Sequence, residues 1–289
     1  MAISYRLTDS AKEYFARIPE VAQLFSNVFR RAFPDDIWRQ WYLDNPYGEP
    51  YVCLGYHDDE LVAHHALVPQ VLEANDGQRL PYLLSKSTMI HPGHRGLREF
   101  LHSADALHEV AKAASYTFIL AFPNSSSAPV FEKACGYSPI LQTQLCNWKL
   151  SPLAAGPSER MAHPSERVRS LQYSYPTDSV YWCWRTRHNQ AECRTLGGGQ
   201  IVYKVILPAT LMILDVHTAD GPAAAQHVTH LAEDLGLKTI RLTRCHADQF
   251  GVPAAELVPH EDYVVRFFGF SLCANVPDVR FSLLLSDVF

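Results

Sequence analysis

The sequence predicts an α/β (α+β) protein made of two related halves, each a mixed, mostly antiparallel sheet flanked by helices. Short apolar runs with strand character alternate with segments of helical periodicity. The same alternation recurs in weaker form after a proline-rich, polar segment at 151–180. The chain has 289 residues, 47% hydrophobic and 19% charged, which suffices for two domains of ordinary size. We therefore expect a first domain over 1–150, a connecting segment over 151–180 and a second, degenerate domain over 181–289.

The first half is expected to open with helices. Over residues 10–43, apolar side chains such as Val21, Leu24 and Phe25 recur at a spacing of three to four, and Pro34 followed by two aspartates suits the start of a second helical piece. Turn residues then separate apolar runs. The pattern predicts strands at 51–57, 61–73, 80–90 and 116–122, a helix of about fifteen residues after the turn at 91–96, and a short helix at 128–135 that ends at Gly136.

The second half repeats part of this plan. Strands are predicted at 200–207, 210–216, 238–245, 264–270 and in the closing segment RFSLLLSDV, and a helix at 222–236 that ends at Gly236. In the first half, an Arg-Gly turn at residues 95 and 96 joins a strand to a helix. The corresponding connection of the second half, DVHTADGPAAAQ, has no Arg-Gly turn and carries Gly221 followed by Pro222 instead. Two similar halves, only one of which carries such a turn, predict a tandem protein with one working site.

Charge and cysteine usage narrow the class of protein. The net charge of −5 and the sequence pI near 6.3 argue against binding to nucleic acid or to an anionic membrane. No apolar run approaches the roughly 18–20 residues that span a bilayer, and the first residues do not resemble a secretory signal. The seven cysteines are odd in number and form no CxxC pair. We expect a cytoplasmic protein with reduced thiols and no metal; Cys183, His188 and Cys193 fit no common zinc spacing.

Two local patterns resemble a known family. MIHPGHRG (89–96) joins a strand to a helix through an Arg-Gly turn, and AFPNSSSAPVFEKACGY (121–137) joins a strand, an Asn and a short helix, about 30 residues later. In this order the two patterns, within residues 51–148, resemble a Gcn5-related N-acetyltransferase domain. The resemblance implies an acyl-CoA cosubstrate and direct attack of an amine on its thioester.

The resemblance also implies where acyl-CoA binds. In this fold the fourth and fifth strands splay apart, and the peptide-like pantetheine arm pairs with the free strand edge. The N-terminus of the following helix receives the pyrophosphate. The residues implied in this site are Met89, Ile90, His91, His94, Arg95, Gly96, Leu97, Arg98, Asn124 and Phe131. Three positions depart from the family pattern: Arg98 and Phe100 replace glycines of the turn, and Phe131 replaces a tyrosine that protonates the leaving thiolate in many relatives.

Candidates for proton removal from the amine are His64 and His65 in LVAHHALVP, which strand alternation places on opposite faces of the sheet. The alternative interpretation of each is an ordinary buried or surface histidine with no role in the reaction. Asn124 is a candidate contact to the substrate or the pantetheine, and it is equally explained as a helix N-cap.

The second half bears on the acceptor. W-x-W-R at 182–185 and the closing LLLSDVF resemble tandem acyltransferases that modify nucleotide-linked amino sugars, and also peptidyltransferases of the FemAB type that use aminoacyl-tRNA. The aromatic cluster at 181–184 either stacks on a base or sugar or belongs to the core. Trp184, Arg185 and Arg266, together with Arg187, are candidates to bind the acceptor, since guanidinium groups suit a diphosphate. We expect small-molecule substrates, no nucleic acid and no membrane partner. A homo-oligomer is compatible with the sequence, and a non-catalytic acyl-CoA-binding protein is the alternative from another functional class.

Overall fold

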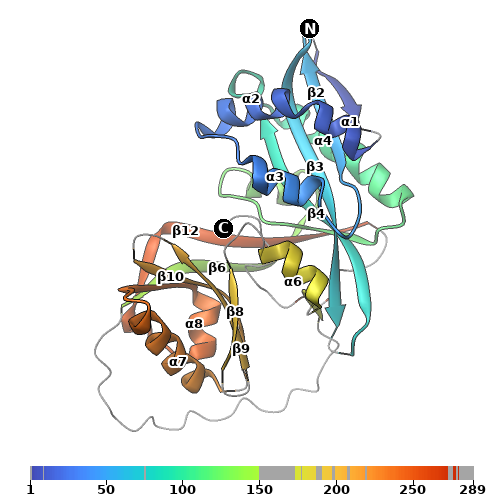
Figure 1. Ribbon diagram of the computed structural model, residues 1–289. Coiled ribbons are helices and arrows are strands. Elements are labelled where there is room, and N and C mark those ends of the chain that lie inside the picture. The colour runs from blue at the N-terminus through green and yellow to red at the C-terminus, as the bar shows by residue number, and fades with distance from the viewer. Residues whose placement is uncertain are drawn as a thin grey trace.

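A computed structural model describes residues 2–8, 10–74, 76–149, 173–176, 178–186, 191–196, 199–206, 209–218, 220–272, 276, 277 and 279 (Figure 1). Helices lie at α1 (Ala11–Ala16), α2 (Ile18–Phe29), α3 (Asp35–Tyr42), α4 (Leu97–Ala113), α5 (Ala128–Lys133), α6 (Ser179–Thr186), α7 (Gly221–Asp234) and α8 (Arg244–Phe250), with short 3₁₀ turns at Pro92–His94 and Ala254–Glu256. Strands lie at β1 (Ser4–Leu7), β2 (Tyr51–His57), β3 (Glu60–Ala74), β4 (Arg79–Ile90), β5 (Phe118–Ala121), β6 (Ser138–Lys149), β7 (Tyr173–Ser174), β8 (Glu192–Leu196), β9 (Gly199–Ile206), β10 (Thr210–His217), β11 (Thr239–Thr243) and β12 (Leu257–Ser271).

All described strands belong to one mixed sheet. Its order is β1-β2-β3-β4-β5-β12-β6-β11-β10-β9-β8, with β7 beside β3. Most neighbours are antiparallel; β4 with β5 and β10 with β11 are parallel. The predicted α/β class, with two related halves, is confirmed: β9, β10, α7, β11 and α8 repeat the order of β3, β4, α4, β5 and α5.

The two halves share a strand. β12 belongs to the second half in sequence, yet it lies between β5 and β6 of the first half, antiparallel to both (Figure 1). Most of the segment 151–180 lies outside the described residues, so the boundary at 150 stays a prediction. The sheet of the first half is complete only when β12 is present.

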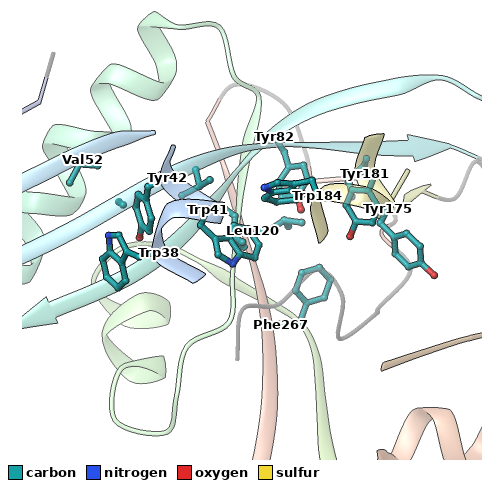
Figure 2. Close-up of a cluster of buried hydrophobic side chains, with 14 of the residues drawn as sticks. Trp38, Trp41, Tyr42, Val52, Tyr82, Leu120, Tyr175, Tyr181, Trp184 and Phe267 are labelled. Carbon is teal, nitrogen blue, oxygen red and sulfur yellow. The ribbon is translucent and has the colours of Figure 1, made fainter. Parts of the chain in front are cut away.

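Helices cover both faces of the first half. Helices α1 to α3 pack on one face, where Tyr14, Leu24 and Trp41 join a large core with the strands, and α4 and α5 pack on the other, where Leu107 and Phe131 are buried. The core under α3 continues into the second half. There Trp184 of α6 contacts Trp41 with ring centroids 5.0 Å apart (Figure 2).

Several elements were not predicted from the sequence. β1, β6 and β8 lack strong alternation over enough residues, and α6 and α8 were not expected as helices. The strand predicted at 238–245 ends at Thr243, because the Thr243 side chain caps α8 by accepting from the His246 N–H. The closing segment RFSLLLSDV lies outside the described residues.

Candidate active site

The parallel strands β4 and β5 separate to form a fork. They pair over three positions only, from Leu83 opposite Ile119 to Ser85 opposite Ala121. Past this point β5 ends at Ala121, whereas β4 continues to Ile90 with β3 alone as its partner. The other edge of β4 therefore presents backbone groups that no described strand pairs. We call this opening, with Ser85 at its floor and Ile90 at its mouth, the fork.

The wall of the fork carries a strained β-bulge. His64 pairs with Met89 and Ala66 with Lys86, so Ser87 and Thr88 together oppose His65. Ser87 has φ of 53°, in the left-handed region, where a non-glycine residue costs about 1–2 kcal/mol. Strain of this kind persists only where neighbouring groups hold it.

A buried chain of hydrogen bonds through His64 holds the bulge. His64 Nδ1 lies 2.8 Å from the carbonyl oxygen of Ser87 and therefore donates to it. Nε2 must then accept, and it lies 3.0 Å from the hydroxyl of Tyr14, which in turn accepts from the Trp38 indole N–H. His64 is 1% exposed, and burial lowers its pKa to about 4. His64 is neutral with both nitrogens occupied, so this arrangement favours positioning the bulge over removing a proton.

His65 lies on the opposite face of the sheet, as strand alternation predicted. Its Nδ1 is 3.3 Å from the hydroxyl of Ser103 on α4, and its Nε2 is 3.1 Å from the hydroxyl of Ser85 at the floor of the fork. Burial, with a contribution from nearby His108, lowers the pKa of His65 to about 3. Neither histidine reaches an open surface, yet both act on the fork, one at its wall and one at its floor.

The mouth of the fork leads into the Arg-Gly turn. The backbone N–H of His91 donates to the Val62 carbonyl of β3, so by alternation the groups of Ile90 point toward the fork. Met89 is buried and lies on the wall. Gly96 is the N-cap of α4, and the first-turn N–H groups of Leu97 and Arg98 have no carbonyl partner within the helix. A polar hollow of about 330 Å³ adjoins this turn and is lined in part by His57, His94, Arg95, Arg98, Glu99 and His102.

An acidic side chain stands at this helix N-terminus. A Cβ added to Gly96 would meet the Glu99 carboxylate, the far end of a flexible side chain that would then have to shift, so the two groups lie close together. A carboxylate beside the first turn of α4 satisfies the helix dipole in the way a phosphate would. Glu99 therefore competes with any anion at the turn, whereas the exposed Arg95 and Arg98 favour one.

We expect Glu99→Gln to strengthen acyl-CoA binding by about fivefold, because removing one charge near a diphosphate in water is worth about 1 kcal/mol. Isothermal titration with acetyl-CoA measures the change. Glu109→Gln, on an exposed position later in the same helix, is the matched control and should bind as the wild type does. Weaker binding by Glu99→Gln would mean that Glu99 assists the ligand.

The other predicted acyl-CoA residues lie beyond β5. Asn124 is exposed, and its Oδ1 accepts from the backbone N–H groups of Ser126 and Ser127, at 3.0 and 2.9 Å, so it caps the turn before α5. Phe131 is buried against Phe100, at 5.2 Å between ring centroids. The Asn124 oxygen is thus engaged by the protein itself, and the Phe131 position offers no hydroxyl.

The predicted acceptor residues are only partly gathered. Trp184 and Arg185 are both buried on α6 and pack on Trp41, with the Arg185 Cζ 4.7 Å from its ring centroid. Arg266 is on β12, and since its neighbours Val265 and Phe267 face the core that contains Trp184, Arg266 faces away from it. Arg187 lies outside the described residues.

Sequence reasoning missed a lysine at the fork. Lys86 follows Ser85 directly, and its Nζ lies 3.9 Å from the Trp41 ring centroid, on the face opposite α4. The signal was a lysine inside a predicted strand, YLLSKSTMI. Trp41, Lys86 and Arg185 together bring both halves of the chain to one side of the fork.

The second half has a similar opening that is filled. β10 and β11 pair from Thr210 to Met212 and then part, but the N-terminus of α7 is closed. The Asp220 side chain accepts from the Ala223 N–H, and a Cβ on Gly221 would collide with the carbonyl of Gln249 in α8. Packing therefore leaves no space for a phosphate at this turn.

This geometry can be compared with known structures. No protein-family model and no curated protein sequence matches the chain. A Gcn5-related N-acetyltransferase from Kribbella flavida is similar at 12% identity, covering 92% of this chain and 71% of that one, with a TM-score of 0.60. A Gcn5-related N-acetyltransferase from Anabaena variabilis is similar at 14% identity, covering 93% of this chain and 73% of that one, with a TM-score of 0.62. A protein from Enterococcus faecalis described as a probable N-acyltransferase is similar at 10% identity, covering 94% of this chain and 73% of that one, with a TM-score of 0.63.

The chain has the fold of the Gcn5-related N-acetyltransferases. At these identities the likeness establishes the fold alone. The fold predicted from MIHPGHRG and its companion segment is thereby confirmed.

Side chains of the metal-ligating types lie scattered over the described part of the chain. There, no three His, Cys, Asp or Glu side chains gather as a metal ion would require, and His188 lies outside that part. No described helix is long and apolar enough to cross a bilayer.

Proposed function

We propose that the protein is an acyl-CoA-dependent N-acyltransferase that acts on a small amine. The observation that carries this proposal is the fork, where β4 continues past Ser85 to Ile90 with no described strand on that edge and leads directly into the turn and N-terminus of α4. An unpaired edge suits a ligand with amide groups, and a helix N-terminus beside two arginines suits a pyrophosphate. Acyl-CoA has these two parts in this order.

The residues of the chain then have distinct roles. Backbone groups near Ile90 bind the pantetheine arm, and the turn with Arg95 and Arg98 binds the pyrophosphate. The bulge at Ser87, held by His64, fixes the backbone amides of the wall where the thioester carbonyl polarises. The amine must lose a proton to react. Because His64 and His65 are buried and their ring nitrogens already have hydrogen-bond partners, we assign water as the acceptor of that proton.

The acceptor is proposed to lie on the side of the fork where Trp41, Lys86 and Arg185 meet. Aromatic and basic groups suit a nucleotide-linked amino sugar, which is our first choice. The peptidyltransferase alternative, with aminoacyl-tRNA, is less favoured because the net charge is −5. A panel of amino-sugar nucleotides and simpler amines, with release of free CoA thiol as the signal, tests the transfer. Binding of acyl-CoA with no release across the panel would favour a non-catalytic acyl-CoA-binding protein.

The turn itself can be tested by one substitution. Gly96 has φ of −169°, which proline cannot adopt, and proline also removes an N–H from the turn. We expect Gly96→Pro to weaken acetyl-CoA binding at least tenfold, or about 1.4 kcal/mol, in isothermal titration.

Gly93→Ala is the control for this substitution. It retains the backbone N–H groups of the same turn and places its Cβ 3.4 Å from His91, an ordinary contact. It should bind acetyl-CoA as the wild type does. An unchanged dissociation constant in Gly96→Pro, with folding intact by circular dichroism, would count against the turn as the pyrophosphate site.

A further inference from the structure

Two buried cations share one indole ring beside the floor of the fork. Nζ of Lys86 lies 3.9 Å from the ring centroid of Trp41, and Cζ of Arg185 lies 4.7 Å from the same centroid. Lys86 is 6% exposed and Arg185 is 3% exposed. Lys86 comes from β4 and Arg185 from α6 of the second half, so the fold brings charges that are distant in sequence to one ring.

A third positive charge faces the same core. On β9, Val202 and Ile206 pack on the core that contains Trp41, and strand alternation puts Lys204 between them on that face. Burial and the charge of Arg185 lower the pKa of Lys204 to about 8. Like charges gathered on one side of the fork repel one another, and a bound anion relieves that repulsion.

The ring of Trp41 is engaged by these cations of the protein itself. An ammonium and a guanidinium group are both attracted to the face of an indole, which fixes their positions. Trp41 also belongs to the same core as Leu120 of β5, whose neighbour Ala121 is the last β5 residue paired with β4 (Figure 2). What this side of the fork offers to a ligand is therefore positive charge, held next to the floor.

The depth of the fork matches the length of the pantetheine arm. Ile90 at the mouth is opposite Ala63 and Ser85 at the floor is opposite Leu67, so the fork is four positions of β3 deep, or about 13 Å. Between its pyrophosphate and its sulfur the arm has about twelve bonds, the length of about four residues of extended backbone. The sulfur therefore reaches the floor, where Lys86 follows Ser85.

This position limits the size of the acceptor. Before it attacks, an amine must approach the thioester carbon to about 3–3.5 Å. The flexible stem of an extended lysine carries its Nζ about 6 Å from its own Cα. A molecule that reaches both the thioester and Lys86 therefore needs only a few bonds between its nitrogen and its negative charge.

We propose that the acceptor is an amine with a phosphate or carboxylate group a few bonds from its nitrogen, and that Lys86 and Arg185, held by Trp41, bind this group. The inference rests on the proposed acyl transfer and deepens it by naming the feature that selects the acceptor. Lys204 adds to the positive potential. The phosphate of an amino sugar and the acidic group of a simpler amine share this chemistry, and the experiment separates these sources.

Three matched pairs of amines test the selection by acetyl transfer. The pairs are ethanolamine with phosphoethanolamine, propylamine with β-alanine, and glucosamine with glucosamine 1-phosphate. In at least one pair, kcat/KM for the charged amine should exceed that for its neutral partner tenfold or more. The pair with the largest ratio identifies the source of the charge. Ratios near one in all three pairs, or transfer to neutral amines only, would overturn the proposal.

A binding test needs no transfer. CoA carries no acyl group, so CoA and an amine form a complex with the protein that cannot react. In calorimetry of the protein saturated with CoA, at least one charged amine should bind tenfold or more tightly than its neutral partner. Equal affinities within every pair, or no binding of any charged amine, would contradict the proposal.

Substitutions assign the preference to its residues. Lys86→Met removes the charge and keeps an unbranched side chain for the ring of Trp41. Lys86→Met and Arg185→Met should each reduce the charged-to-neutral ratio at least fivefold, while the dissociation constant for acetyl-CoA stays within twofold. Lys86→Arg, which restores the charge, should recover most of the ratio. Lys12→Gln, at an exposed position of α1, is the control and should keep the full ratio.

The outcomes separate this inference from the proposed function. Full preference for charged amines in both Lys86→Met and Arg185→Met, each folded by circular dichroism, overturns the assignment to these residues. Binding of acetyl-CoA by the wild type without any preference for charged amines overturns the inference alone. Absence of acetyl-CoA binding overturns the proposed function, and with it the inference.

Discussion

A fragment of residues 1–150 is expected to remain unfolded or to aggregate, because it lacks β12. That strand lies between β5 and β6, and without it two strand edges are left open inside the sheet. Val265, Phe267 and Phe268 of β12 are each at most 4% exposed, and burying each contributes about 2 kcal/mol. Their loss is comparable with the whole stability of an ordinary domain, about 5–15 kcal/mol. Circular dichroism during urea titration measures the result.

Co-expression of the two pieces is the control for this prediction. A chain of residues 151–289 carries β12 and should restore a folded complex with 1–150, since strand insertion needs no covalent link. Cooperative urea unfolding of the isolated 1–150 fragment, with a slope appropriate to its size, would contradict the account.

Acid is expected to destabilise the protein unusually steeply. Burial lowers the pKa of His64 and of His108 to about 4 and that of His65 to about 3, against 6.5 for an ordinary histidine. Below pH 6.5 the unfolded chain binds protons at these three residues and the folded chain does not. The stability is therefore fully present above pH 6.5 and falls as the pH drops toward 4. Each histidine adds up to about 1.4 kcal/mol per pH unit, or about 4 kcal/mol for the three.

Urea unfolding at several pH values between 7 and 5 measures this slope. His65→Gln, which retains hydrogen-bonding groups but does not titrate, should reduce the slope by about one third. His230→Gln, on the exposed side of α7, should leave it unchanged. Equal slopes in His65→Gln and the wild type would show that His65 is already protonated, or accessible to protons, in the folded state.

Much of the fold was accessible from sequence because local signals agreed with the tertiary structure. Gly136 and Gly236, predicted to end helices, both adopt positive φ, at 74° and 66°. The strands β2, β3 and β4 have apolar runs bounded by turn residues. β12 could not be placed, because a strand that inserts between elements more than a hundred residues earlier leaves no mark on its own neighbourhood.

The site was accessible in outline only. Periodicity correctly put His64 and His65 on opposite faces of β3, but it could not show what each contacts. His64 depends on Tyr14 and Trp38 from two N-terminal helices, and His65 depends on Ser85 and Ser103. Such partners are fixed by long-range packing, so pattern alone left both histidines as candidate bases, a role that remains untested and that their burial disfavours.

The side of the fork that carries Lys86 shows the same limit. Lys86 and Trp41 meet only because α3 crosses the sheet beside β4, and Arg185 joins them from the second half. Arg185 was a candidate from sequence because a guanidinium group suits a diphosphate. Nothing local to Arg266 indicated that it faces the other side of β12.

The central claim is that acyl-CoA binds in the fork between β4 and β5, and titration of the full-length protein with acetyl-CoA in a calorimeter tests it most directly. The account predicts saturable binding of one acetyl-CoA per chain, weakened at least tenfold by Gly96→Pro and unaffected by Gly93→Ala. No heat and no thermal stabilisation, with acetyl-CoA or with a longer acyl-CoA, would contradict it.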